Sequence, residues 1–223
     1  WECQFESGRG HQKILMIKFH FTFDKTKKSQ GLRKKILKKY KNFNPKSSNI
    51  IIVAGGDGYM LNALKKFAKF KKPFYGINCG TFGFLMNKYT SSSLENKIKK
   101  AKKTSINPLE LISNNKNHKK NLIAVNEVSI FRQSRQTASL RLEVDKRIII
   151  KKLISDGVLI STPAGSTAYN LSVHGPILSL NSGKLAITPI SPFRPRRWKG
   201  KVVSNNSIIK LTNLDFKKRP VAA

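Results

Sequence analysis

The sequence predicts an α/β protein in which a Rossmann-like parallel-sheet domain precedes a mostly β, sandwich-like domain. Up to about residue 104, apolar runs of strand length alternate with apolar residues at helical spacing. Beyond a polar stretch at 113–120, the periodicity becomes two, as in 140–145, where Leu, Leu and Val alternate with charged residues. We therefore place a domain boundary near Ile106, which gives an α/β domain at 1–106 and a β-rich domain at 107–223.

The first domain is predicted to follow the order strand, helix, strand, helix, strand, helix. The strands are predicted at 13–19, 50–53 and 74–77, and the segment 24–29 is predicted to be a basic loop. The helices are indicated by three apolar stripes: Leu32, Ile36, Leu37 and Tyr40; Met60, Leu61, Leu64, Phe67 and Ala68; Leu94, Ile98 and Ala101.

The second domain is predicted to consist of short strands separated by turns, with one short helix around 166–172. The strands are predicted at 122–131, 139–144, 147–153, 158–161, 185–190 and 207–211.

The net charge is strongly positive. The 223 residues include 44 Lys+Arg against 11 Asp+Glu, a formal charge of +33. The lysines are spread over helix faces and loops, without an aromatic-interleaved stripe and without a zinc or RNA-recognition signature, so we expect no nucleic-acid partner. A diffuse positive field would still steer phosphorylated small molecules toward the protein.

Cysteine usage and hydropathy predict a cytoplasmic protein with no membrane association. Cys3 and Cys79 have no metal spacing, which argues against a disulfide framework and for a reducing compartment. No apolar run approaches the roughly 18 residues of a membrane span, and residues 1–10 do not form a signal peptide. The chain begins at Trp1 rather than Met, which suggests a fragment or a processed chain.

The chain is organised around 49–64, where a β-branched strand, a Gly-Gly-Asp-Gly turn at 55–58 and a helix follow one another. In this geometry backbone N–H groups and a helix N-terminus can receive phosphate, and glycines let the ligand approach closely. A carboxylate facing a polyphosphate is repelled unless it holds a metal or accepts a proton from a nucleophile, so Asp57 needs an explanation. The run is also compatible with ordinary turn chemistry, with Asp57 capping the helix.

A second glycine-bearing loop, 78–85, follows the third strand. Two successive strands of the predicted sheet therefore end in glycine loops. Open α/β sheets usually bind their ligands at this place.

In the second domain, Asn126 and Glu127 interrupt an apolar strand. Neighbouring residues of a strand point to opposite faces, so at least one of the two breaks the pattern. Buried amides and carboxylates need partners, which favours a pair that binds a ligand hydroxyl or an adenine edge. An edge strand or a bulge is the alternative.

The stretch with the most candidate functional residues is 156–172, DGVLISTPAGSTAYNLS, in which a hydroxyl-rich loop at 162–167 leads into a helix. Small residues and hydroxyls at a helix N-terminus suit a flat or phosphorylated ligand, although a plain capped loop fits as well. Tyr169 can stack on a base or pack in the core. His174 and the basic segment 193–198 could contact a ligand or serve only packing, and no nucleophile turn of the G-x-S-x-G type is present.

Together the three motifs, in this order, resemble the NAD kinase family. The turn at 55–58 is shared with diacylglycerol, sphingosine and phosphofructokinase-type kinases, whereas Asn-Glu plus Thr-Pro-x-Gly-Ser-Thr-Ala-Tyr is much more specific. The segments 172–176 and 190–198 are similar to those of the alphaproteobacterial, ATP/polyphosphate-dependent branch of the family. The resemblance covers roughly 13–220; the family usually continues with a segment that returns to the first domain, whereas this chain stops at Ala223.

The resemblance implies transfer of the terminal phosphoryl group of ATP or polyphosphate to the adenosine 2′-hydroxyl of NAD, which gives NADP. Asp57 would be the catalytic residue that accepts the hydroxyl proton. Mg²⁺ would bridge the donor's oxygens, and no side chain is assigned as a metal ligand. The family assembles as homodimers or homotetramers whose sites are completed between subunits, so the implied partners are NAD, ATP and further copies of the chain.

The resemblance also implies which residues bind the two substrates. The donor phosphates would be admitted by Gly55, Gly56 and Gly58, and the adenine would pack on Phe84. The ribose and nicotinamide portions of NAD would be held by Asn126 and Glu127. The two ends of the dinucleotide would be bound by Asp156, Ala164, Thr167, Ala168 and Tyr169, with Asn170 and Ser172 nearby.

Three other functions compete with this interpretation. A lipid kinase of the same superfamily would need an apolar groove for its acceptor, and that function would not explain the Asn-Glu pair. A nucleic-acid-binding protein would show a steep salt dependence and no effect of Asp57. A catalytically inactive NAD(P) sensor is disfavoured because Asp57 is intact.

Overall fold

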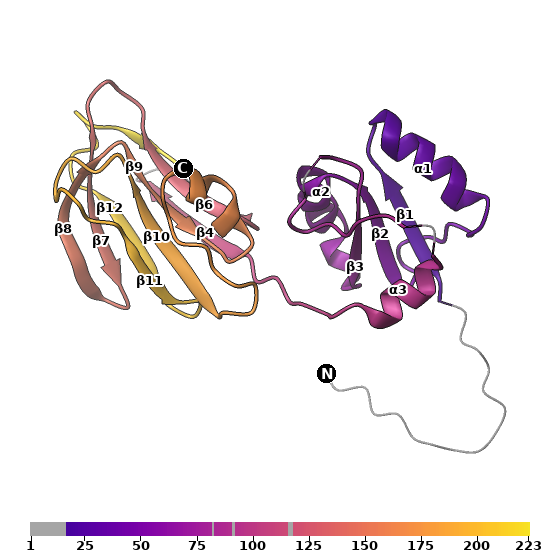
Figure 1. The fold of residues 1–223 in the computed structure, drawn as a ribbon. Helices are drawn as coiled ribbons and strands as arrows, with labels where there is room; N and C mark the ends of the chain where they lie inside the picture. The colour runs from indigo at the N-terminus through magenta and orange to yellow at the C-terminus, as the bar shows by residue number, and fades with distance from the viewer. Residues whose placement is uncertain (1–16, 82, 91, 116–117) are drawn as a thin grey trace, which may run out of the picture. The chain divides into compact units, whose positions relative to one another are not determined.

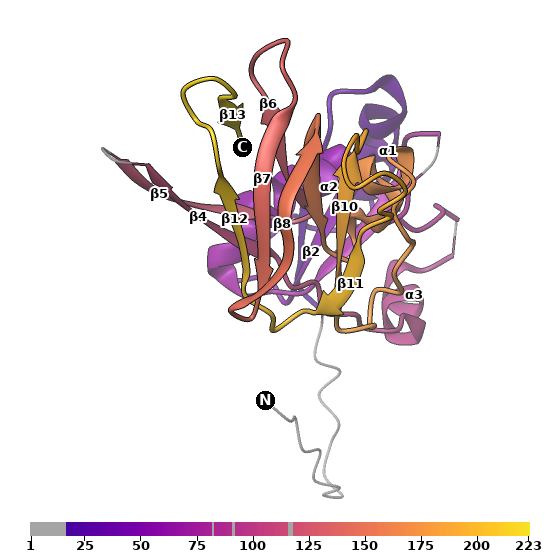
Figure 2. The ribbon, with the colours of Figure 1, turned by 90° about the vertical axis from the view of Figure 1, so that its left-hand side faces the viewer.

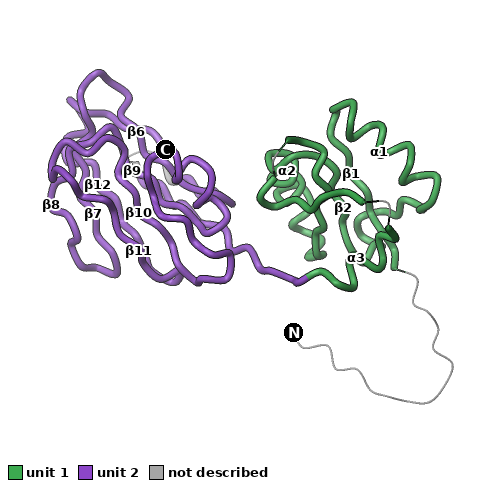
Figure 3. The backbone as a smooth tube through the Cα atoms, viewed as in Figure 1, with its two compact units in different colours: residues 1–101 green, residues 102–223 purple. Residues whose placement is uncertain are grey.

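The computed structural model describes residues 17–81, 83–90, 92–115 and 118–223. The chain forms two compact units, Trp1–Ala101 and Lys102–Ala223 (Figure 3). The predicted assignment of a phosphate-turn domain up to Ile106 and an NAD-binding domain after it stays a prediction.

Unit 1 contains a three-stranded parallel sheet in the order β1–β2–β3 (Figure 1). The strands are β1 (Phe19–Phe23), β2 (Ile50–Gly55) and β3 (Phe74–Asn78). Every residue of β2 is buried, as its uninterrupted apolar run predicts for a central strand covered on both faces. Because the strands are parallel, their carboxyl ends meet at one edge of the sheet.

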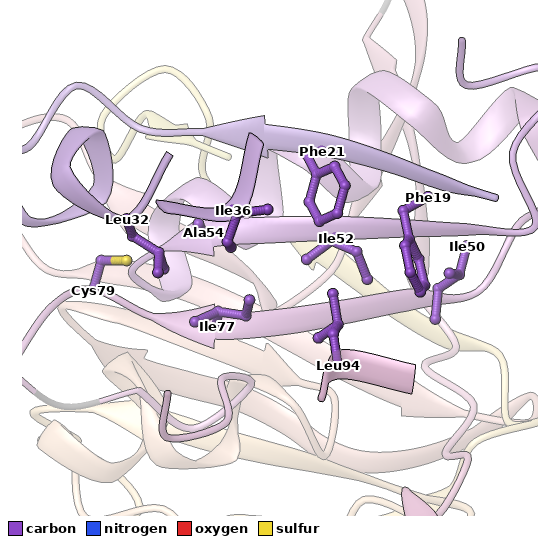
Figure 4. Packing of buried hydrophobic residues seen from close by; sticks show 10 residues of the cluster. All are labelled: Phe19, Phe21, Leu32, Ile36, Ile50, Ile52, Ala54, Ile77, Cys79 and Leu94. Carbon is purple, nitrogen blue, oxygen red and sulfur yellow. The ribbon is translucent and has the colours of Figure 1, made fainter. Parts of the chain in front are cut away.

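Helices cover both faces of this sheet. They are α1 (Lys27–Leu37), α2 (Asp57–Phe67) with the short η1 (Ala68–Phe70), and α3 (Leu94–Lys100). On one face, Leu32 of α1 and Leu94 of α3 share a core with Ile52 and Ile77 (Figure 4). On the other face, α2 packs its apolar stripe against the remaining side chains of β2.

Two predictions for unit 1 differ from the structure. The strand predicted at 13–19 lies outside the described residues up to 16, and β1 begins only at Phe19, where alternate residues are buried. The predicted loop 24–29 is also wrong in its second half, because α1 begins at Lys27. The side chain of Thr26 accepts a hydrogen bond from the Ser29 amide and caps the helix, a signal hidden by the surrounding lysines.

Unit 2 contains two antiparallel sheets and a hairpin, of which Figure 2 shows the sheet β12–β7–β8 in front. The larger sheet has the order β11 (Lys201–Ser204), β10 (Lys184–Ile190), β9 (Gly157–Ser161), β6 (Glu127–Arg132) and β13 (Val221–Ala222). The smaller sheet has the order β12 (Ile209–Asn213), β7 (Ala138–Val144) and β8 (Arg147–Ser155). The hairpin is β4 (Leu109–Asn115) with β5 (His118–Ala124).

The two sheets of unit 2 enclose one core. Leu142 of β7 and Leu153 of β8 are fully buried together with Val158 of β9 and Ile187 of β10. The predicted fold class, a parallel-sheet α/β domain followed by a mostly β domain, is therefore confirmed. No helix in the described residues combines the length and apolar character that crossing a membrane requires.

The structure also corrects details of unit 2. The strand predicted at 122–131 is broken at residues 125–126, where a bend separates β5 from β6. The helix predicted around 166–172 is a 3₁₀ turn, η2 (Gly165–Thr167), followed by one helical turn, α4 (Tyr169–Ser172). Strands β4, β11 and β13 were not predicted, because they are short or polar.

Candidate functional site

The Gly-Gly-Asp-Gly turn lies at the carboxyl edge of the parallel sheet. Gly55 ends β2, Gly56 is the N-cap residue of α2, and Asp57 is the first residue of that helix. The Cys79 amide, just after β3, donates to the Gly55 carbonyl (2.8 Å), so a backbone hydrogen bond joins the two glycine loops. A helix N-terminus at this edge is suited to phosphate.

Asp57 connects the two glycine loops through its carboxylate. Its Oδ2 accepts a hydrogen bond from the Phe84 amide (2.6 Å), and its Oδ1 accepts one from the Leu85 amide (3.0 Å). These bonds fix the orientation of the carboxylate and place the half-exposed Phe84 ring in the neighbouring loop. Each carboxylate oxygen keeps a second lone pair, so Asp57 can still accept a proton.

The structure requires glycine at only one of the three glycine positions of the turn. A Cβ on Gly55 would lie 2.8 Å from the Tyr59 ring and 3.0 Å from Asp24 Oδ2, so the fold itself requires glycine there. A Cβ on Gly56 or Gly58 would meet no described atom within 4 Å. Packing within unit 1 therefore does not explain these two glycines, and their predicted contact with donor phosphates stays a prediction.

Asp24 was not singled out from the sequence. It follows β1 at the carboxyl edge, its amide donates to the Ala54 carbonyl (3.0 Å), and its carboxylate faces Gly55. Its Oδ1 accepts hydrogen bonds from the Thr26 amide and hydroxyl. An acidic residue directly after a strand of a parallel sheet was the signal that could have identified it.

The carboxylates at this edge fit a magnesium ion held mainly by substrate. In the described residues no group of three or more His, Cys, Asp and Glu side chains could hold a metal by itself. Mg²⁺ is usually bound through one or two carboxylates plus substrate phosphates and water. Asp24 beside the glycine turn is such a carboxylate.

In unit 2, the Asn126–Glu127 pair lies beside the hydroxyl-rich loop. Glu127 begins β6 and pairs with Ser161, the last residue of β9, so the loop that starts at Thr162 continues next to Asn126. The Thr162 amide donates to the Asn126 carbonyl (2.8 Å). A Cβ on Gly165 would lie under 3.0 Å from this carbonyl oxygen, so glycine is needed for the close approach.

Two acceptor atoms of this pair are buried without a partner. Asn126 Oδ1 and Glu127 Oε2 make no hydrogen bond within the part of the chain that the structure describes. Desolvation by burial raises the pKa of the Glu127 carboxyl. Unpaired buried acceptors are costly, and two adjacent ones indicate a ligand that brings donors to this place.

The remaining predicted residues of this loop differ in their exposure. Ala164 is buried, Thr167 and Ala168 are partly buried, and Ser172 is exposed at the end of α4. The Tyr169 ring stacks on Phe131 of β6, with centroids 5.9 Å apart and planes inclined by 26°. Sequence reasoning missed Phe131, because an apolar residue in a strand gives no separate signal.

Asp156 and Asn170 lie apart from the unpaired acceptors. Asp156 precedes β9, at the opposite end of the strand from Thr162, and its Oδ1 accepts from Arg132 Nε (2.6 Å). Asn170 is fully buried; its Nδ2 donates to the Pro176 carbonyl (2.9 Å) and its Oδ1 accepts from Thr188 Oγ1 (2.7 Å). The contacts of both residues with a ligand stay predictions.

Two family models match the chain. The model described as the ATP-NAD kinase N-terminal domain matches residues 5–105, and the one described as the ATP-NAD kinase C-terminal domain matches residues 125–223. Among curated proteins, the NAD kinase of Brucella suis is 42% identical over 212 residues, which covers 95% of this chain and 82% of that protein. The NAD kinase of Zymomonas mobilis is 46% identical over 89% of this chain and 78% of that protein.

Solved structures show a similar fold. An NAD kinase from Archaeoglobus fulgidus in complex with ATP superposes with a TM-score of 0.67 at 24% identity, over 87% of this chain and 80% of that one. Yeast NADH kinase complexed with NADH gives a TM-score of 0.64 at 24% identity, over 78% and 52% of the two chains.

Proposed function

This chain belongs to the NAD kinase family, and from that membership we propose how its residues transfer a phosphoryl group from ATP to NAD. The enzyme is a phosphotransferase that phosphorylates NAD. The observation that carries the proposed substrate site is the pair of buried, unpaired acceptors, Asn126 Oδ1 and Glu127 Oε2. A dinucleotide, with ribose hydroxyls and a nicotinamide amide, supplies hydrogen-bond donors of the kind that this pair lacks.

We propose that Asp57 is the general base of the reaction. It accepts the proton of the adenosine 2′-hydroxyl as that oxygen bonds to the terminal phosphorus of ATP, while the bond from this phosphorus to the bridging oxygen breaks and ADP leaves. The α2 N-terminus, with Gly56 and Gly58, receives the donor phosphates, since no side chain there obstructs them. Asp24, together with the donor phosphates, would hold Mg²⁺, which would neutralise part of the phosphate charge.

The rest of the proposed substrate site is assigned from the motif residues. Asn126 and Glu127 accept hydrogen bonds from ribose and nicotinamide, the Tyr169 ring stacks on a base, and Phe84 packs on the adenine. Polyphosphate as an alternative donor, a homodimeric or homotetrameric assembly, and a cytoplasmic location are further parts of the proposal. The free, buried Cys79 agrees with a reducing compartment.

The proposal is tested by incubating the purified chain with NAD, ATP and Mg²⁺ and measuring NADP with an NADP-specific dehydrogenase. We expect NADP that depends on all three additions. A folded chain that binds neither NAD nor ATP would contradict the proposal. Replacement of ATP by polyphosphate in the same assay decides the donor.

Gly58→Ala separates a ligand requirement from a folding requirement. A methyl group at this helical position meets no described atom within 4 Å, so we expect an unchanged or higher melting temperature, since Ala is favoured over Gly in helices by about 1 kcal/mol. If phosphates approach this backbone, the KM for ATP rises. Thermal unfolding and steady-state kinetics measure the two effects, and an unchanged KM would remove Gly58 from the phosphate site.

Glu127→Gln is expected to stabilise the free protein and weaken NAD binding. Burial raises the folded-state pKa of Glu127 above its usual 4.5, so the wild type loses stability as the pH rises through that raised pKa. Glutamine has no charge to desolvate, so the variant does not lose stability in this way. It also lacks a charged acceptor, so the Kd for NAD is expected to rise roughly tenfold or more. Thermal unfolding at acidic and neutral pH, with and without NAD, checks both effects; a variant no more stable at neutral pH would contradict the first.

A further inference from the structure

We propose that Thr162 is a positioning residue for NAD, which acts by holding the Asn126–Glu127 pair in its binding geometry. The inference rests on the proposed role of that pair as the substrate contact. Thr162 itself is fully buried and touches the site only through other residues.

Thr162 provides two links to the bend between β5 and β6. Its Oγ1 donates to the Val125 carbonyl (2.7 Å), and its amide donates to the Asn126 carbonyl (2.8 Å). Both carbonyls of the bend are therefore held by one residue of another segment. Since the backbone at 125–126 sets the direction of the next side chains, Thr162 determines where the two unpaired acceptors point.

The same hydroxyl also joins the bend to the 3₁₀ turn. Thr162 Oγ1 accepts a hydrogen bond from the Gly165 amide (3.2 Å), and Gly165 packs directly on the Asn126 carbonyl. One oxygen thus acts as donor and acceptor between three segments: the bend, the end of β9 and the turn that begins at Gly165. Loss of this oxygen leaves the buried Gly165 amide and the partly buried Val125 carbonyl unpaired.

This arrangement explains why the bend is held from outside. Unpaired acceptors are unfavourable in the free protein, and a bend that could relax would turn them toward water or toward other donors. A rigid link through Thr162 prevents this relaxation and keeps the acceptors ready for the substrate. The bend is thereby preorganised for the substrate, and the cost is the local stability that the unpaired acceptors take from the free protein.

Thr162→Val tests the inference, because valine keeps the shape and removes the oxygen. We expect the KM for NAD to rise about tenfold, as small misplacements of contact groups do, while kcat and the KM for ATP stay unchanged. Thr162→Ser keeps the oxygen and is expected to keep the wild-type KM. An unchanged KM for NAD in the valine variant, or a serine variant as impaired as the valine one, would overturn the inference.

A matched control separates positioning from general destabilisation. Ser48 is also a buried hydroxyl residue, whose Oγ donates to the Pro45 carbonyl (3.0 Å) in a turn that precedes β2, away from the glycine loops. Ser48→Ala should lower the melting temperature without changing either KM. If it raises the KM for NAD as Thr162→Val does, the effect of Thr162 is not specific. If Thr162→Val does not fold, Thr162→Ala, which also lacks the oxygen, replaces it under the same criteria.

A double-mutant cycle with Asn126→Ala shows whether Thr162 acts through the pair. We expect Thr162→Val to raise the KM for NAD less in the Asn126→Ala background than in the wild type, because coupled residues are not additive. Full additivity would overturn the inference. If Asn126→Ala alone leaves the KM for NAD unchanged, the proposed substrate contact is wrong; if it raises the KM and Thr162→Val does not, only the inference about Thr162 is wrong.

Discussion

Asp57→Asn is expected to reduce kcat by about 10²–10⁴-fold, the usual contribution of a positioned general base. Asparagine has nearly the same shape but cannot accept the proton of the 2′-hydroxyl. NAD binding should remain, because the unpaired acceptors of Asn126 and Glu127 lie in the other unit. Steady-state kinetics and equilibrium binding of NAD measure the two quantities, and near-normal turnover would exclude Asp57 as the base.

The bonds of Asp57 require a control for this variant. Asparagine keeps one carbonyl oxygen, so it retains only one of the hydrogen bonds to the Phe84 and Leu85 amides and turns its own NH₂ group toward the other. Gly83→Ala disturbs the same loop but keeps the carboxylate, since its Cβ would lie 2.9 Å from Met86 Cβ and 3.3 Å from Asp57 Oδ1. If both variants lose turnover equally, loop displacement rather than loss of the base explains the result.

The fold was predictable where local pattern and tertiary environment agree. The uninterrupted apolar run of β2 and the alternation in β7 identify their strands, because burial on both faces and on one face leave different patterns. The bend at 125–126 was not the favoured prediction, since LIAVNEVSIF reads as one strand and a bulge at Asn126–Glu127 was only the alternative. What breaks this strand is a residue 37 positions away: Thr162 takes the Val125 carbonyl that a longer strand would offer to its neighbour.

The site was predictable to a similar degree. Glu127 stands out because its polarity contradicts an apolar strand, and Asp57 stands out because a carboxylate is unexpected in a turn suited to phosphate. Phe131 and Thr162 could not be separated from ordinary strand and loop residues, because their roles depend on contacts with other segments. Asn170 was predicted from its motif to bind the ligand. In the structure both its side-chain nitrogen and its side-chain oxygen make hydrogen bonds within unit 2.

Gly165→Ala is the second change with a large expected effect. Its new methyl carbon would lie under 3.0 Å from the Asn126 carbonyl and 2.5 Å from its carbon, both backbone atoms that cannot rotate away. The bend or the turn must move, which costs roughly 1–3 kcal/mol of folding stability, as overpacking usually does. Because the moving atoms belong to Asn126, we expect the Kd for NAD to rise together with the loss of melting temperature.

Gly31→Ala is the matched control for this variant. Gly31 lies within α1 and a Cβ there meets no described atom within 4 Å, so alanine should raise the melting temperature and leave NAD binding unchanged. Thermal unfolding and calorimetric titration with NAD compare the two alanine variants directly. A Gly165→Ala protein that binds NAD like the Gly31→Ala protein would show that the bend can move without consequence. The close approach of Gly165 to Asn126 would then serve packing alone, and the glycine of this motif would have no part in holding the substrate.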